Sequence, residues 1–260
     1  MPSENAVVDP ASDPRRHPSI SQNTMGLLKK LFGRNTKDQV ANPPSSPKDD
    51  DPSPDIAPQL APALEAYQQG QYEAAITAAA PYASRHADAN RLCALAYSDM
   101  RRYPEAFPYW LALFEQEPSA HNALQLATTS VMCGELKRGE AWLMKFDEVN
   151  EQTHEMSSVT ARTQFISSLT QSGHMAEALP YLDWLRDVYA HVRITDSHFL
   201  YMRGIPFFPS FLENSLPILK ANLPIEAIAQ WYGVLSGQLD EEGEAQLGQW
   251  VQSLTVAAES

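Results

Sequence analysis

The sequence has few of the features that mark secreted or membrane proteins. Only two of its 260 residues are cysteines, Cys93 and Cys133, and they form no CxxC motif. We expect both to be small buried residues of a protein in a reducing compartment, because disulfide frameworks need more cysteines and an oxidising environment. No apolar run approaches the ~18 residues of a membrane span, and the N-terminus lacks the pattern of a signal peptide. These absences predict a cytoplasmic location.

Catalytic and metal-binding motifs are also absent. The seven histidines are scattered through the chain, and no two have the i, i+4 spacing of a helical metal site. The sequence contains no GxGxxG, GxxxxGK[ST] or GxSxG motif. Acidic pairs such as Asp147-Glu148 and Glu241-Glu242 are consecutive, so their side chains diverge around a helix. We therefore expect no catalytic residue, no metal and no cofactor.

The chain has few positive charges relative to its negative ones, with 19 Lys and Arg against 32 Asp and Glu. Residues 1–60 hold 7 Lys and Arg and 8 Asp and Glu. Residues 61–260 therefore hold 12 basic and 24 acidic residues, and this part of the chain is acidic. An acidic surface repels nucleic-acid phosphates. The charge therefore argues against a nucleic-acid partner and is compatible with a protein that has a basic face.

The N-terminal segment, residues 1–57, is rich in Pro, Ser and Asp, a composition that buries too little apolar surface to fold. We expect a disordered tail with one short basic amphipathic patch at residues 25–34. On a helix, its apolar face would be flanked by lysines. The patch could dock on a membrane surface or a partner, or it could have no binding role, and Met25 could be the native start. Its docking residues would be Leu27, Leu28, Lys29, Lys30, Leu31 and Phe32.

Residues 58–190 contain an internal repeat. The sequence EAFPYW at residues 105–110 returns as EALPYL at 177–182, and in each case a turn and a large residue precede it. The large residue marks four units, at Tyr72, Tyr103, Leu136 and Met175, spaced by 31, 33 and 39 residues. Apolar residues recur every three or four positions before each turn, which indicates helices. A small residue follows each marker, and it would allow close helix packing.

These units resemble tetratricopeptide repeats (TPRs), whose period is about 34 residues. The second unit matches best, with Ala94, Tyr97, Ala106, Trp110 and Pro118 at the spacing of that family. The resemblance implies an all-α, right-handed α-α superhelix (a TPR-like solenoid) of about four helix pairs. We expect residues 191–260 to form a helical C-terminal extension that caps the open end of the array.

The resemblance also implies a binding site, because the first helix of each pair lines a concave surface in this family. The groove would hold a peptide or a partner helix. Only one basic residue falls there, so a clamp for a terminal carboxylate is not expected. An open alternative is that these residues are simply solvated. The partner-binding candidates are Arg91, Leu95, Asp99, His121, Gln125, Thr128, Gln164, Ser167 and Gln171.

A second candidate site lies in the C-terminal extension, in the aromatic sequence IPFFPSFL at residues 205–212. These aromatic residues either pack inside the cap or form a binding patch. The members of the patch would be Phe207, Phe208 and Phe211.

The sequence thus favours a non-enzymatic adaptor or chaperone-like protein that holds a partner protein on the concave face of the array. One alternative is an escort or inhibitor of a secretion-system or toxin partner. Another is a membrane-surface organiser recruited through residues 25–34, peripheral to the membrane.

Overall fold

The computed structural model describes residues 57–258, and within them every regular element is a helix. The predicted tail at residues 1–57, apart from Ala57, and its basic patch at 25–34 lie outside the described residues. Contacts divide the chain after Ala61. The first unit contributes only the 3₁₀ helix η1 (Pro58–Leu60) and the first residue of α2 to the described part. The account below concerns the second unit, from Pro62 onwards.

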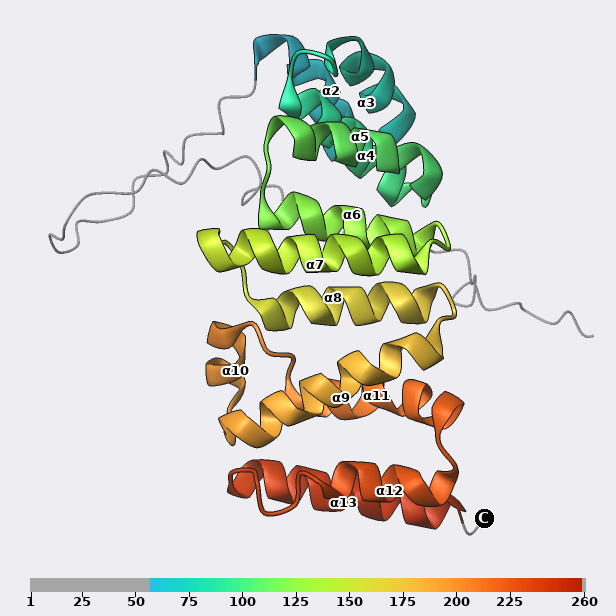
Figure 1. The fold of residues 1–260 in the computed structure, drawn as a ribbon, viewed down its shortest axis with the longest axis vertical. Coiled ribbons are helices and arrows are strands. Elements are labelled where there is room, and N and C mark those ends of the chain that lie inside the picture. The colour runs from blue at the N-terminus through green and yellow to red at the C-terminus, as the bar shows by residue number, and fades with distance from the viewer. Residues whose placement is uncertain (1–56, 259–260) are drawn as a thin grey trace, which may run out of the picture. The chain divides into compact units, whose positions relative to one another are not determined.

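The helices follow one another with short connections, and neighbouring helices pack against each other (Figure 1). None of the helices in the described range is long and apolar enough to cross a lipid bilayer. The elements are α2 (Ala61–Gln68), α3 (Tyr72–Ala79), η2 (Ala80–Tyr82), α4 (Ala87–Asp99), α5 (Tyr103–Gln116), α6 (Ala120–Met132), α7 (Leu136–Thr153), α8 (Ser158–Gln171), α9 (Met175–Val192), α10 (Ser197–Arg203), α11 (Phe208–Asn222), α12 (Ile225–Gly233) and α13 (Glu241–Ala258).

Four helix pairs, from α2–α3 to α8–α9, are each joined by a three-residue turn of the same conformation. The middle residue has a positive φ in every case: 73° at Gly70, 58° at Arg101, 79° at Gly134 and 84° at Gly173. The N–H of the following residue donates to a carbonyl five positions earlier, which satisfies a free carbonyl at the helix end. The large residues that mark the repeat in the sequence are the first residues of α3, α5, α7 and α9. The repeated phrase therefore corresponds to a repeated backbone turn.

The small residue predicted in each second helix is buried in all four pairs, as Ala75, Ala106, Gly139 and Ala178. At Gly139 on α7 the approach is close enough to require the absence of a side chain. A Cβ added there would lie 2.6 Å from Cγ2 of Val131 and 3.1 Å from the carbonyl oxygen of Ala127, both on α6. A larger residue would force the Val131 side chain or the backbone of α6 to move, because real Cβ atoms essentially never come as close as 2.6 Å to another atom.

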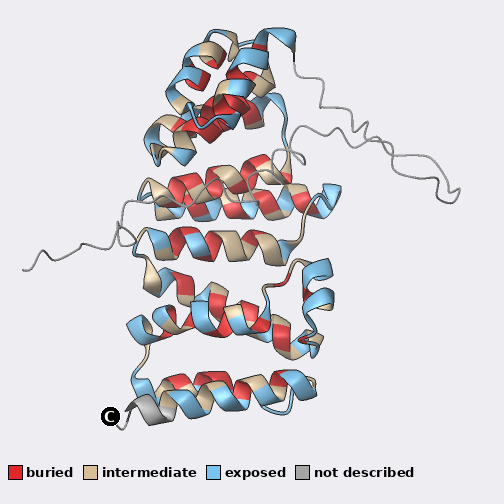
Figure 2. Ribbon diagram, turned by 180° about the vertical axis from the view of Figure 1, so that it is seen from behind, coloured by how far each residue is buried: buried red, intermediate tan, exposed pale blue. Residues whose placement is uncertain are grey.

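Packing continues from one pair to the next. The second helices α3 and α5 contact the following first helices α4 and α6, and the first helices α6 and α8 contact each other. Most helices have one buried side and one exposed side (Figure 2), as expected for amphipathic helices around a shared core.

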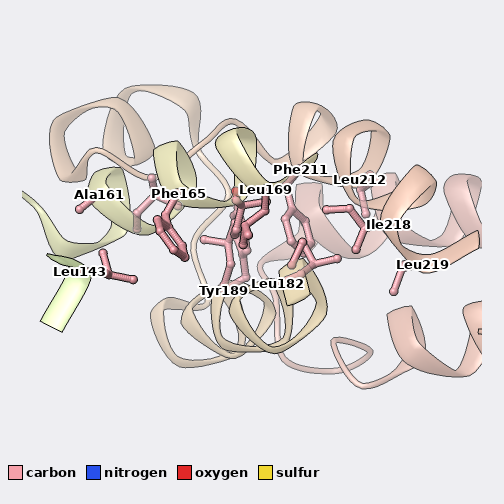
Figure 3. Close-up of a cluster of buried hydrophobic side chains, with 14 of the residues drawn as sticks. Leu143, Ala161, Phe165, Leu169, Leu182, Tyr189, Phe211, Leu212, Ile218 and Leu219 are labelled. Atoms are coloured by element: carbon pink, nitrogen blue, oxygen red, sulfur yellow. The ribbon is translucent and has the colours of Figure 1, made fainter. Parts of the chain in front are cut away.

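One hydrophobic core runs from α6 to α13 and joins the last two pairs to the C-terminal helices. Tyr189 of α9 contacts Phe208 of α11, with ring centroids 5.2 Å apart. It also contacts Phe211 of α11, with ring centroids 4.6 Å apart (Figure 3). Phe208 is 0% and Phe211 2% exposed. These two residues are core residues, so the alternative binding patch predicted from the sequence does not exist as a surface. Of its three members only Phe207 is exposed.

Two of the C-terminal helices, α10 and α13, begin at an aspartate that caps them. The Asp196 carboxylate accepts the N–H of Phe199 at the start of α10, and Gly204 ends that helix with φ of 65°. Asp240 precedes α13 and accepts the N–H of Gly243 as well as the N–H of Thr195. Burial alone would raise the pKa of the Asp240 carboxyl, but the hydrogen bond from the Thr195 hydroxyl, together with these two N–H bonds, outweighs it and lowers the pKa. Asp240 thus links the connection after α9 to the last helix.

Candidate binding groove

Local capping fixes the two helices at the centre of the candidate site. The Ser119 hydroxyl accepts the N–H of Asn122 at the start of α6, and the Ser157 hydroxyl accepts the N–H of Val159 at the start of α8. The Glu155 carboxylate, in the longer connection between α7 and α8, also accepts the N–H of Ala120 at 2.8 Å. A negative charge stabilises the N-terminus of α6 through the helix dipole. This hydrogen bond therefore ties the N-terminus of α6 to the connection that leads into α8.

Between α6 and α8, neutral side chains line a groove with a volume of about 310 Å³, which we call the polar lobe. It brings together five of the nine partner-binding residues predicted from the sequence. These are Gln125 and Thr128 on α6, and Gln164, Ser167 and Gln171 on α8.

The four other predicted residues do not line this lobe. Arg91 on α4 is only 6% exposed and pairs with Asp88 and, at 2.7 Å, with Glu117, so it stabilises the fold. Leu95 is 7% exposed and belongs to the core. The Asp99 carboxylate accepts the hydroxyl proton of Tyr67 at 2.6 Å, which connects α4 to α2.

His121 is the fourth residue outside the lobe. It lies one helical turn before Gln125, and a ring nitrogen is 3.5 Å from the Gln125 amide nitrogen. Burial and the nearby charge of Arg91 lower the pKa of His121 to about 4. The imidazole is therefore neutral at pH 7, and it contributes no charge next to the lobe.

Six lining residues were not predicted. Those on α6 and α8 each lie four positions from a predicted residue, so a wider stripe on each helix would have included them. The Tyr103 phenol comes from a second helix, α5, and only the packing of α5 on α6 brings it to the lobe. Burial raises the pKa of Tyr103, which keeps the phenol neutral. The six residues are Ser98, Tyr103, Thr129, Met132, Thr163 and Ser168.

A second cavity of about 300 Å³, the apolar lobe, lies on the other side of α8. It shares Thr163 and Ser167 with the polar lobe, so the two lobes adjoin at α8, and we refer to them together as the groove. Helices α9 and α11 supply its apolar wall, in which Leu182, Phe211 and Ile218 lie close together (Figure 3). The sequence did not predict this lobe, because it depends on where α11 packs.

Three carboxamides on the groove lining make no hydrogen bond to any described residue. They belong to Gln164 and Gln171 on α8 and Asn214 on α11. Each carboxamide offers a donor and an acceptor. Most hydroxyls of the lining, by contrast, bond to a carbonyl of their own helix, as Ser167 does to Thr163 at 3.0 Å. The carboxamides are thus the groups best able to bind a second molecule.

Charged side chains are absent from the described lining of both lobes, although the chain as a whole has a net charge of −13. Within residues 57–258, no three His, Cys, Asp or Glu side chains come close enough together to hold a metal ion. The chemistry that the groove offers is hydrogen bonding to amides and contact with apolar groups.

Comparison with known proteins does not assign this site to a family. No protein-family model matches the chain, and no curated protein is significantly similar to it.

Proposed function

We propose that the chain is a non-enzymatic protein-binding module, an adaptor or chaperone-like protein with a TPR-like superhelix of about four helix pairs and a helical C-terminal cap. Three features support the architecture: the repeated turn, the buried small residue of each second helix, and the packing of each pair on the next. A module that stacks pairs in this way forms an extended surface suited to a partner protein.

The groove is the observation that carries this proposal. First helices of the pairs, the second helices α5 and α9, and α11 all contribute to its lining. In the described chain this lining has no charged side chain, and it offers free carboxamides. Carboxamides suit the main chain of a bound segment, which has one donor and one acceptor per residue. Affinity in such a groove comes from hydrogen bonds and from a few buried apolar anchors.

The setting that we propose is the cytoplasm. Cys93 and Cys133 are free thiols, and burial raises the pKa of Cys93 to about 12. A thiol with this pKa stays protonated and unreactive at neutral pH, as is typical of a structural cysteine in a reducing compartment.

A substitution at Ser167 tests the proposal. Ser167 lines both lobes and is exposed, so Ser167→Arg puts a bulky charged side chain into the groove without disturbing the core. Thr77→Arg on α3 is the matched control, because Thr77 is also an exposed helical hydroxyl bonded to the carbonyl four residues earlier. Arginine is a better helix former than serine or threonine, so both variants should fold.

The measurement is quantitative affinity capture from native cell extract with the full chain and both variants. We expect at least one co-purifying protein to fall about tenfold with Ser167→Arg, equivalent to about 1.4 kcal/mol of binding free energy, and to stay at the wild-type level with Thr77→Arg. If every captured protein is retained equally by both variants, the groove is not the binding site.

A further inference from the structure

The apolar lobe belongs to the C-terminal helices as much as to the repeats. Its wall combines Ile166 of α8 and Leu182 of α9 with Phe211 and Ile218 of α11. The extension that the sequence suggested as a cap therefore also completes a cavity next to the polar lobe. The rim of this cavity holds Asn214, which is exposed.

The size of the lobe suits a large side chain. A cavity of about 150 Å³ lined by Leu, Ile and Phe binds benzene, and the apolar lobe has about twice that volume, near 300 Å³. It can therefore take a leucine, methionine or phenylalanine side chain. Burial of such a side chain removes its apolar surface from water, which favours binding.

The uncharged lining restricts what can enter. A charged group that leaves water needs a paired charge or several hydrogen bonds, and the described lining has no ionised partner to offer. A peptide main chain is different, because its N–H and C=O groups can bond to the free carboxamides on either side of the lobe. Gln164 and Gln171 lie on one side, and Asn214 on the other.

We propose that the apolar lobe holds one large apolar side chain from an uncharged, extended segment of the partner protein, whose main chain bonds to these carboxamides. The proposal rests on the protein-binding function of the groove and adds the chemistry of the segment. A bound segment that crosses from α6 over α8 to α11 spans about two interhelical distances, or ~20 Å. About six residues of extended chain cover that distance.

The test uses a phage-displayed library of random 12-residue peptides, selected on the full-length chain. We expect selected peptides to share a stretch of about six residues without Asp, Glu, Lys or Arg and with one Leu, Met or Phe. In a synthetic copy of the best peptide, replacing that residue by glycine, aspartate or lysine should weaken binding at least about tenfold. Selected peptides with a charge in the shared stretch, or no effect of the replacement, would refute the proposal.

Two variants of the protein locate the peptide. Asn214→Glu places a carboxylate at the rim of the apolar lobe and should weaken binding about tenfold. Gln230→Glu on α12 makes the same exposed change of amide to acid outside the groove and should have no effect. If Ser167→Arg abolishes peptide binding while Asn214→Glu leaves it unchanged, the groove binds peptides and only the role of the apolar lobe fails. If neither variant has an effect, or no selected peptide is sensitive to Ser167→Arg, the protein-binding function of the groove fails as well.

Discussion

Gly139 shows how a single atom sets the distance between two helices. Glycine is a poor helix former, and alanine at an exposed helical site is favoured by about 1 kcal/mol. At Gly139, however, the added methyl group would overlap Val131 and press on a backbone carbonyl of α6. Packing therefore outweighs helix propensity at this position.

The first prediction compares two glycines in helices. Gly139→Ala should lower the free energy of unfolding by about 1–3 kcal/mol through overpacking. Gly248→Ala on α13, where a Cβ would meet nothing within 4 Å, should raise it by up to about 1 kcal/mol. Urea denaturation of both variants measures the difference. Equal effects of the two substitutions would mean that α6 and α7 are not in close contact.

His121 gives the second prediction, on the pH dependence of stability. Its pKa is about 4 in the folded chain and about 6.5 in an unfolded one. The unfolded state therefore binds the proton first as the pH falls, so the folded state loses stability between pH 6.5 and 4. The loss amounts to about 2 kcal/mol at pH 5.

His121→Gln removes this titration and keeps a polar side chain of similar size. The difference in unfolding free energy between wild type and variant, measured at pH 7 and at pH 5, should change in favour of the variant by about that amount. A difference that is the same at both pH values would place the imidazole in water rather than beside Arg91.

Among the elements, the four three-residue turns are the clearest repeated feature. Three of them have glycine at the position with positive φ, and the second has Arg101, with φ of 58°. A side chain costs about 1–2 kcal/mol in this left-handed conformation. The array therefore tolerates one strained turn where glycine would be favoured.

The third prediction follows from that strain. Arg101→Gly should stabilise the chain by about 0.5–1 kcal/mol, after the greater flexibility of unfolded glycine is subtracted. Gly134→Ala should destabilise it by about 1 kcal/mol, because a Cβ there meets no other atom and only the backbone strain acts. Thermal unfolding measures both. The two substitutions must change the stability in opposite directions. A loss of stability in Arg101→Gly would show that the arginine side chain makes a contact that outweighs the backbone strain.

The sequence contained the turns and the small residues, because both are local requirements. A positive φ favours glycine at the turn, and a close helix crossing favours alanine or glycine five residues after it. The burial of Arg91 and of Phe208 could not be predicted from such local requirements. Arg91 is paired with Glu117, 26 residues later, and Phe208 packs on Tyr189 of another helix. Their burial depends on tertiary packing, which no local pattern states.

The same reasoning explains what was missed in the groove. Gln125 and Gln164 could be proposed from a family resemblance because each lies on the first helix of a pair. The apolar lobe could not, because Phe211 and Ile218 come from an extension outside the repeat. Their position beside α8 follows from the shared core that runs from α6 to α13.

For the second unit as a whole, charge is distributed unevenly: the chain is acidic, but the described groove lining is neutral. The fourth prediction is that partner or peptide affinity changes less than about threefold between 50 and 500 mM NaCl, because salt screens interactions between charges and hardly affects hydrogen bonds and apolar contacts. Titrations at three salt concentrations measure this. A steep loss of affinity with salt would instead indicate that acidic residues outside the groove bind a partner with a basic face.

The most direct measurement is site-specific photo-cross-linking. A benzophenone amino acid is placed at position 167 in the groove or, as the control, at position 77 on α3, and each protein is irradiated in native extract. The proposed function predicts a cross-linked partner from position 167 and none from position 77. A partner captured only from position 77, or equally from both, would contradict it.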